Sequence, residues 1–235
     1  MIKEILKNVL KDIDFNLTDE QLSQFEKYYS MIIEWNERIN LTAITDPEEV
    51  AKKHFADSLS IIKVLSLNEI ESVIDVGTGA GFPGIPLKIA FPHIKITLLD
   101  SLNKRIQYLG EVNDNLALSD VVLIHGRAET VARDPVHRQK YDLCVSRAVA
   151  NLSVLSELCT PFVKVGGIFA PYKSEKADEE LNEAANALNI LGCEVRKIEK
   201  FNLFDQVRCI PVIEKIKNTE DKYPRREGIP GKRPL

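Results

Sequence analysis

The sequence predicts an α/β fold with a doubly wound, mostly parallel, Rossmann-like sheet of seven strands and an N-terminal helical extension. Three observations lead to this prediction. Helical periodicity fills residues 1–68, short β-rich runs alternate with helical stretches from Ser72 onward, and a glycine-rich turn follows the first of those runs. Strands that alternate with helices of this length are typical of a parallel sheet with helices on both faces.

Two helix starts can be recognised in the N-terminal extension. Thr18 and Gln21 have the spacing of a capping box, in which a threonine oxygen and a glutamine side chain each satisfy a free backbone N–H. Asp46-Pro47 marks a second start, because an aspartate cap and a proline at the first helical position both favour a helix N-terminus. We expect a helix through residues 51–65 to follow.

The β/α part is expected at residues 69–217, between the extension at 1–68 and a tail at 218–235. Its strands are predicted at 72–77, 95–100, 120–126, 141–148, 166–172, 193–201 and 208–216. Its helices are predicted at 84–91, 102–116, 152–163 and within 178–191. The last two strands can pair as a terminal hairpin, which would add one antiparallel strand to the sheet.

Composition limits the classes of partner. The chain has 235 residues, 44% of them hydrophobic, and a formal net charge of −4, so it can bury one sizeable core and has no global basic bias. A nucleic acid would therefore need a local basic surface. The tail is one such surface, because residues 215–235 hold seven Lys/Arg and three Asp/Glu. Its three prolines argue against a regular helix there.

Neither a membrane nor a metal is expected. The N-terminus is too charged for a signal peptide, and no apolar run approaches the roughly 20 residues that a membrane span needs. The cysteines, Cys144, Cys159, Cys193 and Cys209, are not spaced as metal ligands, so we expect them to be buried, reduced thiols. We therefore expect a cytoplasmic protein without a metal.

The glycine-rich turn predicts a ligand close to the backbone. A turn of this kind after the first strand opens a helix whose N-terminus carries free N–H groups. Gly79-x-Gly81-x-x-Gly84 matches the dinucleotide fingerprint, which by itself is a weak signal.

Two acids narrow the choice of ligand. Asp75 lies inside the first strand, where an acid suits a ligand with a cationic end, such as S-adenosylmethionine with its ammonium and sulfonium groups. Asp100 ends the second strand, 19 residues after Gly81, where a carboxylate can accept hydrogen bonds from ribose hydroxyls of NAD or S-adenosylmethionine. Asp100 fits both ligands equally well, whereas Asp75 and the terminal hairpin favour the methyl donor. Either acid could instead cap a turn or helix.

Several segments resemble one bacterial family. They are "WNERINLTAI", "HFADSL", "IDVGTGAGFPGIPL", "LLDSLNKR", "GRAE", "SRAVA" and the tail "IKNTEDKYPR", in this order. Together they are similar to the ribosomal RNA small-subunit methyltransferase G family, also called glucose-inhibited division protein B. Lys173-Ser174 departs from the Lys-Gly that many members have at this position.

The resemblance implies a class I, S-adenosylmethionine-dependent enzyme without a metal. It would methylate N7 of one guanine in the 530 loop of 16S ribosomal RNA. The resemblance favours the 30S subunit over bare RNA as the substrate, a choice that the sequence leaves open, and we expect a monomer. Donor contacts in the family match Gly77, Phe82, Ala128, Glu129 and Arg147. From the physical argument above we add Gly79 and Asp100.

The predicted chemistry needs no catalytic side chain. Methylation of cytosine C5 needs a thiolate nucleophile, and Cys144 lacks the Pro-Cys context of such a residue. Exocyclic amines usually call for an Asn/Asp-Pro-Pro-aromatic clamp, whereas the fourth strand ends in Ser146-Arg147-Ala148. Guanine N7 carries a lone pair and no proton, so direct displacement can proceed by alignment alone. We therefore name no catalytic residue.

Basic side chains are candidates for the RNA surface. The tail could bind RNA or serve as a strap packed over the domain, and deleting residues 222–235 should distinguish the two by its effect on the salt dependence of RNA binding, with donor binding intact. Arg147 could bind the donor or the acceptor, or form a structural salt bridge. The candidate RNA-binding residues are His54, Lys104, Arg105, Lys173, Arg225 and Arg226.

Three other functions remain open from the sequence. One is a methyltransferase for a small molecule, with the helical extension as a lid. Another is a nicotinamide-dependent oxidoreductase, which only the glycine fingerprint supports. The third is a ribosome assembly factor with a vestigial donor site, against which the intact Gly77, Asp100 and Arg147 argue.

Overall fold

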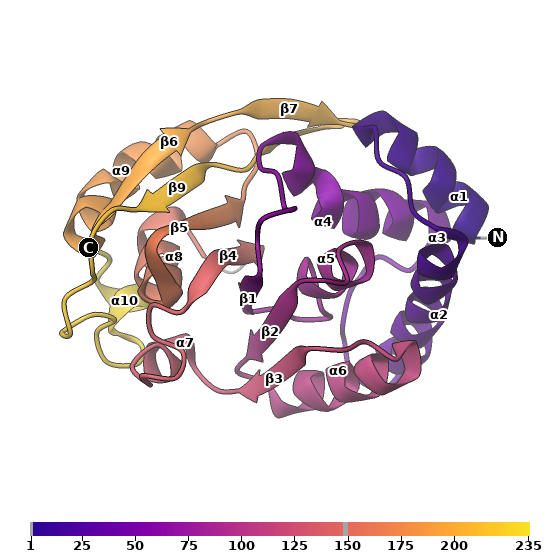
Figure 1. Cartoon of the computed structure of the whole chain (residues 1–235), viewed down its shortest axis with the longest axis horizontal. Helices are drawn as coiled ribbons and strands as arrows, with labels where there is room; N and C mark the ends of the chain where they lie inside the picture. The colour runs from indigo at the N-terminus through magenta and orange to yellow at the C-terminus, as the bar shows by residue number, and fades with distance from the viewer. Residues whose placement is uncertain (1, 148–149) are drawn as a thin grey trace.

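The computed structural model describes residues 2–147 and 150–235, and its main feature is one twisted sheet (Figure 1). The strand order is β3-β2-β1-β4-β5-β9-β6, and the first five strands in that order run parallel to one another. β9 runs antiparallel to both β5 and β6. The predicted seven-stranded, mostly parallel sheet is confirmed. The strands are β1 (Ser72–Val76), β2 (Lys95–Asp100), β3 (Val121–His125), β4 (Tyr141–Arg147), β5 (Val163–Tyr172), β6 (Cys193–Lys197), β7 (Lys200–Leu203), β8 (Gln206–Cys209) and β9 (Val212–Lys215).

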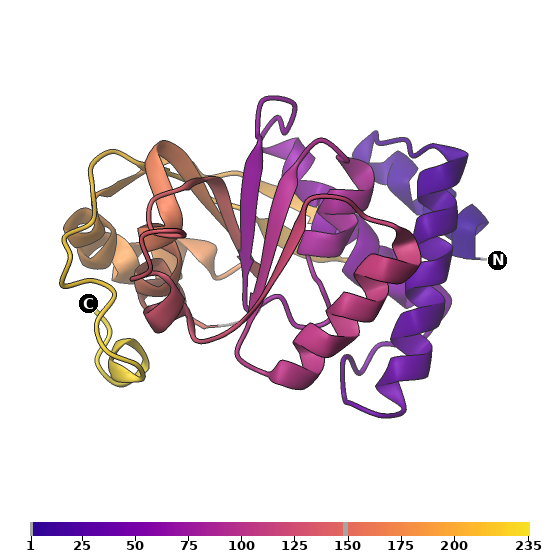
Figure 2. The same cartoon turned by 60° about the horizontal axis from the view of Figure 1, so that its bottom comes forward.

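Helices cover both faces of the sheet, because its strands present apolar side chains to both sides. Successive residues of a strand point to opposite faces. Along β1, Val73 belongs to the core beneath the N-terminal helices and Ile74 to the core beneath α8 and α9. Figure 2 shows the indigo and purple N-terminal helices and the orange helices on opposite sides of the central strands. The helices are α1 (Ile2–Val9), α2 (Asp19–Asn36), α3 (Pro47–Val50), α4 (Asp57–Leu59), α5 (Gly84–Ala90), α6 (Asn103–Leu116), α7 (Ala128–Val131), α8 (Leu152–Cys159), α9 (Ala177–Leu191) and α10 (Ile229–Lys232).

Both predicted helix starts in the N-terminal extension are confirmed. The Thr18 hydroxyl accepts the Gln21 N–H, and the Gln21 side chain accepts the Thr18 N–H. Asp46 accepts the N–H groups of the first turn of α3. The helix expected at 51–65 is present as consecutive π, α and 3-10 turns rather than as one regular α-helix.

The terminal strands differ from the prediction in one respect. β6 and β9 pair as predicted, but the chain between them forms a second antiparallel pair, β7 and β8. Pro211, which has no N–H for a ladder, stands between β8 and β9 and explains that break. Figure 1 shows β7 extending away from the sheet edge toward the N-terminal helices. There Lys52 and Lys63 lie over the rings of Phe204 and Phe201.

The tail forms one short helix, which the sequence did not lead us to expect. α10 begins at Ile229, and Pro230 lies in its first turn, where a backbone N–H has no helical partner in any case. A proline at that position is therefore compatible with a helix, and the argument from three prolines was wrong for this turn.

Candidate functional site

The loops after β1 and β2 and the end of β4 surround a cavity of about 400 Å³. This is the edge of the sheet where parallel α/β folds bind their ligands. The predicted Gly77, Gly79, Phe82, Asp100, Arg105 and Arg147 all line it, together with His54 from the N-terminal extension. The other lining residues are Leu41, Thr42, Thr78, Ala80 and Ser101.

The glycines of the fingerprint have different reasons to be glycine. A Cβ on Gly81 would lie 2.7 Å from the Tyr28 hydroxyl, and one on Gly84 would collide with Leu98. Those two positions serve the internal packing of the loop. Gly79, by contrast, has a φ of +62°, and a Cβ there would have no neighbouring atom within 4 Å. Gly79 therefore leaves its side of the loop open toward the cavity, as a closely bound ligand requires.

Asp100 ties the two loops of the cavity together. One carboxylate oxygen accepts the Gly79 N–H at 2.9 Å, and the other accepts the Leu102 N–H at 2.9 Å. The Arg105 guanidinium lies 3.3 Å from the first of these oxygens. A carboxylate has about four acceptor sites, so Asp100 can still accept one ribose hydroxyl.

Asp75 lies beneath the glycine loop rather than in the cavity. One of its oxygens accepts the Thr78 hydroxyl at 2.7 Å and the Gly84 N–H at 2.9 Å. This is the capping role that the sequence left open as an alternative. Burial raises its pKa to about 6, despite these hydrogen bonds. Its other oxygen has no hydrogen-bond partner among the residues that the structure describes.

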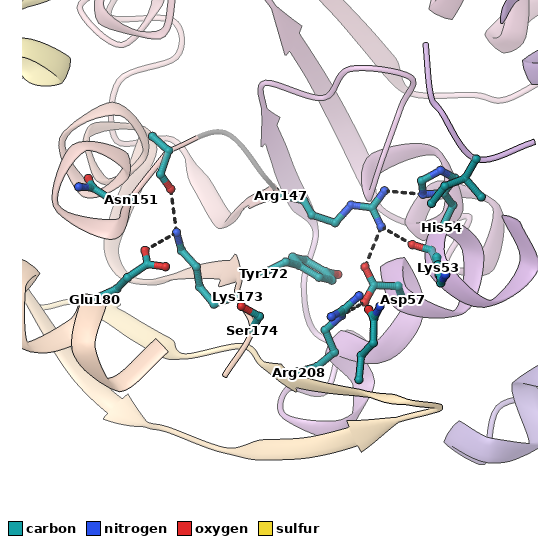
Figure 3. Close-up of a pocket in the computed structure, with 13 residues that line it drawn as sticks. Lys53, His54, Asp57, Arg147, Asn151, Tyr172, Lys173, Ser174, Glu180 and Arg208 are labelled. Carbon is teal, nitrogen blue, oxygen red and sulfur yellow. Dashed lines mark hydrogen bonds and ion pairs between the residues drawn. The ribbon is translucent and has the colours of Figure 1, made fainter. Parts of the chain in front are cut away.

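A larger cavity of about 740 Å³ adjoins the first, and His54 and Arg147 line both. Figure 3 shows Lys173 and Glu180 on one side of it and Arg147, Asp57 and Arg208 on the other. The remaining lining residues are Ile44, Lys53, Ala150, Asn151, Tyr172, Ser174 and Gln206.

Arg147 separates the two cavities. One terminal nitrogen lies 2.8 Å from Asp57 and also donates to the Lys53 carbonyl, and the guanidinium carbon is 5.0 Å from the centre of the Phe82 ring. The structure therefore contains the salt bridge that the sequence left as one alternative. It also places the same guanidinium against both cavities.

His54 is held as a neutral imidazole. Its ring stacks on Phe82 at 4.5 Å, and its Nε2 lies 2.8 Å from the Thr42 hydroxyl. Because arginine can only donate, Nδ1 must accept from Arg147, which leaves the proton on Nε2. Burial, with a further effect of the Arg147 charge, lowers its pKa from 6.5 to about 4.

Comparison with known proteins places this site in a family. The profile described as rRNA small subunit methyltransferase G matches residues 21–207. The chain belongs to the rRNA small subunit methyltransferase G family. Relatives carry the name ribosomal RNA small subunit methyltransferase G. One from Alkaliphilus metalliredigens is 50% identical, with 99% of this chain and 98% of the relative covered. One from Staphylococcus aureus is 48% identical, with 100% and 99% covered.

Solved structures agree on the fold. A putative O-methyltransferase from Klebsiella pneumoniae superposes with a TM-score of 0.59 at 12% identity, covering 90% of this chain and 96% of that one. A SAM-dependent methyltransferase from Aquifex aeolicus gives 0.55 at 19% identity, with 79% and 98% covered. These likenesses support the methyltransferase fold of the family.

Two predicted donor contacts lie outside the cavity lining. Ala128 and Glu129 begin α7, directly after β3, at the same edge of the sheet as Asp100. The Glu129 carboxylate accepts the Gly228 N–H at 3.1 Å, so the tail reaches this loop. Arg127 pairs with Glu227 beside it.

The predicted RNA-binding residues have different surroundings. Lys104 and Arg226 are exposed. Lys173 donates to the Ala150 carbonyl and lies 2.7 Å from Glu180. Arg225 makes a two-pronged contact with Glu157, whose side chain is fully buried.

Basic side chains of the domain hold the tail in place. Arg133 donates to the carbonyls of Asp221, Lys222 and Pro224. Arg138 donates to those of Thr219, Glu220 and Tyr223. The tail is thus packed against the domain as the strap alternative described, whether or not its exposed charges also bind RNA.

Sequence reasoning missed Asp57 and Arg208. Asp57 is 3% exposed, and its two oxygens bind Arg147 and Arg208, which are 61 residues apart. Asp57 lies within the "HFADSL" segment, so the family resemblance could have pointed to it. Nothing local to Arg208 predicts that β8 would bring it to this cavity.

Within the described residues, the helices offer no candidate for a membrane span. The same residues contain no group of three or more acids, cysteines or histidines arranged to hold a metal ion.

Proposed function

We propose that this chain transfers a methyl group from S-adenosylmethionine to N7 of a guanine in the 530 loop of 16S ribosomal RNA. Membership of the rRNA small subunit methyltransferase G family, over nearly the whole chain, carries the proposal. The two adjoining cavities that share Arg147 and His54 support it, because donor and acceptor must meet at one boundary.

The residues of the smaller cavity fit the donor. Gly79 leaves the loop backbone open, and Asp100 keeps acceptor capacity for one ribose hydroxyl. Phe82 offers an apolar ring at the boundary, stacked on a neutral His54. Bound there, S-adenosylmethionine supplies an activated methyl group on its sulfonium. A structure solved with this donor, M. jannaschii TYW2 with AdoMet, shares the fold at a TM-score of 0.50.

The side chains at the boundary suit an acceptor that has no proton to lose. The low pKa of His54 keeps it neutral at pH 7, and its proton is directed to Thr42. Burial raises the pKa of Cys144, which is fully buried in β4 and is therefore not poised as a thiolate nucleophile. Guanine N7 needs neither a base nor a nucleophile, so the residues have only to align the two reactants.

The test is transfer of a tritiated methyl group from S-adenosylmethionine. The acceptors are 30S subunits that lack the modification, the same RNA stripped of protein, and a pool of small metabolites. The product is digested to nucleosides. We expect label in 7-methylguanosine, with the 30S subunit as the better acceptor. Label only in a metabolite would favour the small-molecule enzyme, and donor binding without any transfer would favour the assembly factor.

A further inference from the structure

Arg208 reaches the larger cavity from the hairpin of β7 and β8. Its Nε donates to Asp57 at 2.5 Å, and its side chain is 20% exposed. The same carboxylate receives Arg147 on its other oxygen. Arg208 therefore joins the hairpin to the N-terminal extension and to the end of β4, as Figure 3 shows.

The cations of this cavity differ in how many donors they have left. Arg147 uses one terminal nitrogen on Asp57 and Lys53, and the other on His54. Lys173 is bound to Ala150 and Glu180. The two terminal nitrogens of Arg208 have no hydrogen-bond partner within residues 2–147 and 150–235. Arg208 thus offers a planar pair of donors, which matches the geometry of a phosphate.

The net positive charge around Arg208 also favours the binding of an anion. The cavity lining contains four cations, Lys53, Arg147, Lys173 and Arg208, against the two carboxylates of Asp57 and Glu180, and Lys53 also pairs with Glu49 outside this lining. Two guanidinium groups share the buried carboxylate of Asp57, so this cluster keeps one positive charge in excess. One anionic group bound here would neutralise a partly buried charge that water stabilises poorly.

We propose that Arg208 binds a phosphate of the RNA acceptor, at or next to the nucleotide that is methylated, with Asp57 holding its guanidinium in place. This inference rests on the proposed function and names a substrate contact that the hairpin supplies. Most residues that line the cavity are polar or charged, and Ile44, Ala150 and Tyr172 are the exceptions. The planar donor pair of Arg208 favours a phosphate of the RNA backbone as its partner.

The test compares the unmodified chain with Arg208→Gln, in which the amide can still donate to Asp57. The matched control is Lys200→Gln, which removes one charge from the same hairpin, where Lys200 pairs with Asp178 outside this cavity. Each protein is titrated with 16S ribosomal RNA lacking the modification, over a range of salt concentrations and without donor. S-adenosylhomocysteine affinity and thermal unfolding are measured in parallel.

We expect Arg208→Gln to weaken RNA binding about tenfold at low salt, as loss of a charge-assisted hydrogen bond does. The slope of log K against log salt should fall by about 0.7, the value for one phosphate on a single strand. S-adenosylhomocysteine affinity should stay unchanged. Arg208→Lys should keep the salt slope while losing part of the affinity, because lysine retains the charge but not the planar pair of donors.

An unchanged slope and affinity in Arg208→Gln, or an equal change in Lys200→Gln, would overturn this inference. Either result would leave the proposed function standing if the unmodified chain still labels 7-methylguanosine. A chain that shows the expected slope but never methylates RNA would support the phosphate contact and contradict the proposed function instead.

Discussion

The arginines that hold the tail and Arg208 in the larger cavity differ in where their donors are directed. In the tail region, Arg133, Arg138 and Arg225 direct most of their donors to backbone carbonyls and to the buried Glu157. In the larger cavity, Arg208 directs only its Nε to a protein group among the described residues. The first group fixes the chain, whereas the second leaves donors for a ligand. The hydrogen-bond partners of a basic side chain in the structure therefore indicate ligand binding better than its presence in the sequence.

The largest expected effect is a loss of folding free energy when the buried ion pair of the tail is broken. Arg225→Ala would leave Glu157 without its counter-charge in a fully buried position. Breaking such a pair costs about 3 kcal/mol of folding free energy. Urea unfolding of the variant should show this loss, while Arg226→Ala, an exposed neighbour, should change stability by less than about 0.5 kcal/mol.

A second substitution checks that this cost comes from the stranded charge. In Arg225→Ala combined with Glu157→Gln, the buried group is neutral, so most of the lost stability should return. Equal stability of Arg225→Ala and the unmodified chain would show that the tail is not fastened at this point, and the contrast between the two groups of arginines would fail.

The next effect concerns the donor cavity. Asp100→Ala removes the acceptor for the N–H groups of Gly79 and Leu102, so the glycine loop loses its tie to the loop after β2. We expect S-adenosylhomocysteine to bind at least tenfold more weakly, corresponding to about 1.5–3 kcal/mol for hydrogen bonds to a charged group. Calorimetric titration measures this. Asp114→Ala, an exposed acid on α6, serves as the control. Equal affinity in both variants would argue against a donor in this cavity.

A smaller expected effect is on the pH dependence of folding stability, to which His54 contributes. Its folded-state pKa of about 4 lies below the ordinary 6.5, because burial and Arg147 disfavour the charged ring. The unfolded chain then binds more protons between these values, so His54 contributes stability above pH 6.5 that is lost as pH falls toward 4. His54→Gln should remove this dependence, which amounts to about 1.4 kcal/mol for each unit between the two pKa values.

Chemical unfolding of both proteins from pH 4 to pH 7 would measure the difference. Asp75 contributes with the opposite sign, because its raised pKa of about 6 makes its contribution fall as pH rises through that value. Since Asp75 is present in both proteins, the difference between them isolates His54. If the stability of the unmodified chain and of His54→Gln changes with pH in the same way, the pKa of His54 is the same in the folded and unfolded chains.

Features of this structure that depend on neighbouring residues could be predicted from the sequence, whereas contacts between distant residues could not. Local signals, such as the capping box at Thr18 and the alternation of strands and helices, predicted the sheet and the N-terminal helices correctly. The glycine spacing and Asp100 predicted a cavity at the strand ends, although Asp75 caps the turn instead of lining it. The assignment of donor and RNA roles to individual residues stays a prediction, as do the domain limits at 1–68 and 69–217.

Long-range partners account for what sequence reasoning missed. Asp57 meets Arg208 across 151 residues, and Glu157 meets Arg225 across 68. No periodicity or spacing within either segment specifies such a pair, because each pair forms only when the sheet and the hairpin are in place. The candidate RNA-binding set therefore contained Arg225, most of whose donors have partners inside the protein, and did not contain Arg208, whose two terminal nitrogens have none among the described residues. The RNA role of either residue stays a prediction.

The smallest expected effect tests whether the tail touches the donor region. A chain ending at Arg226 keeps Arg225 and the segment that Arg133 and Arg138 hold, but loses Glu227 and Gly228, the partners of Arg127 and Glu129. Deletion from residue 222, by contrast, would also strand Glu157. We expect the shorter chain to bind S-adenosylhomocysteine about twofold more weakly, since one exposed hydrogen bond is worth about 0.5 kcal/mol.

Lys222→Gln is the matched control, because it changes tail charge at a residue that pairs with Glu220 nearby. If the chain ending at Arg226 keeps full donor affinity, Glu129 is positioned without the tail, and the strap acts on stability alone. If affinity falls in the shorter chain and not in the control, residues 227–235 help to position Glu129, and the end of the tail has an indirect part in donor binding. The arginines that fix the tail would then affect donor binding only through Glu129, whereas Arg208 would contact its ligand directly.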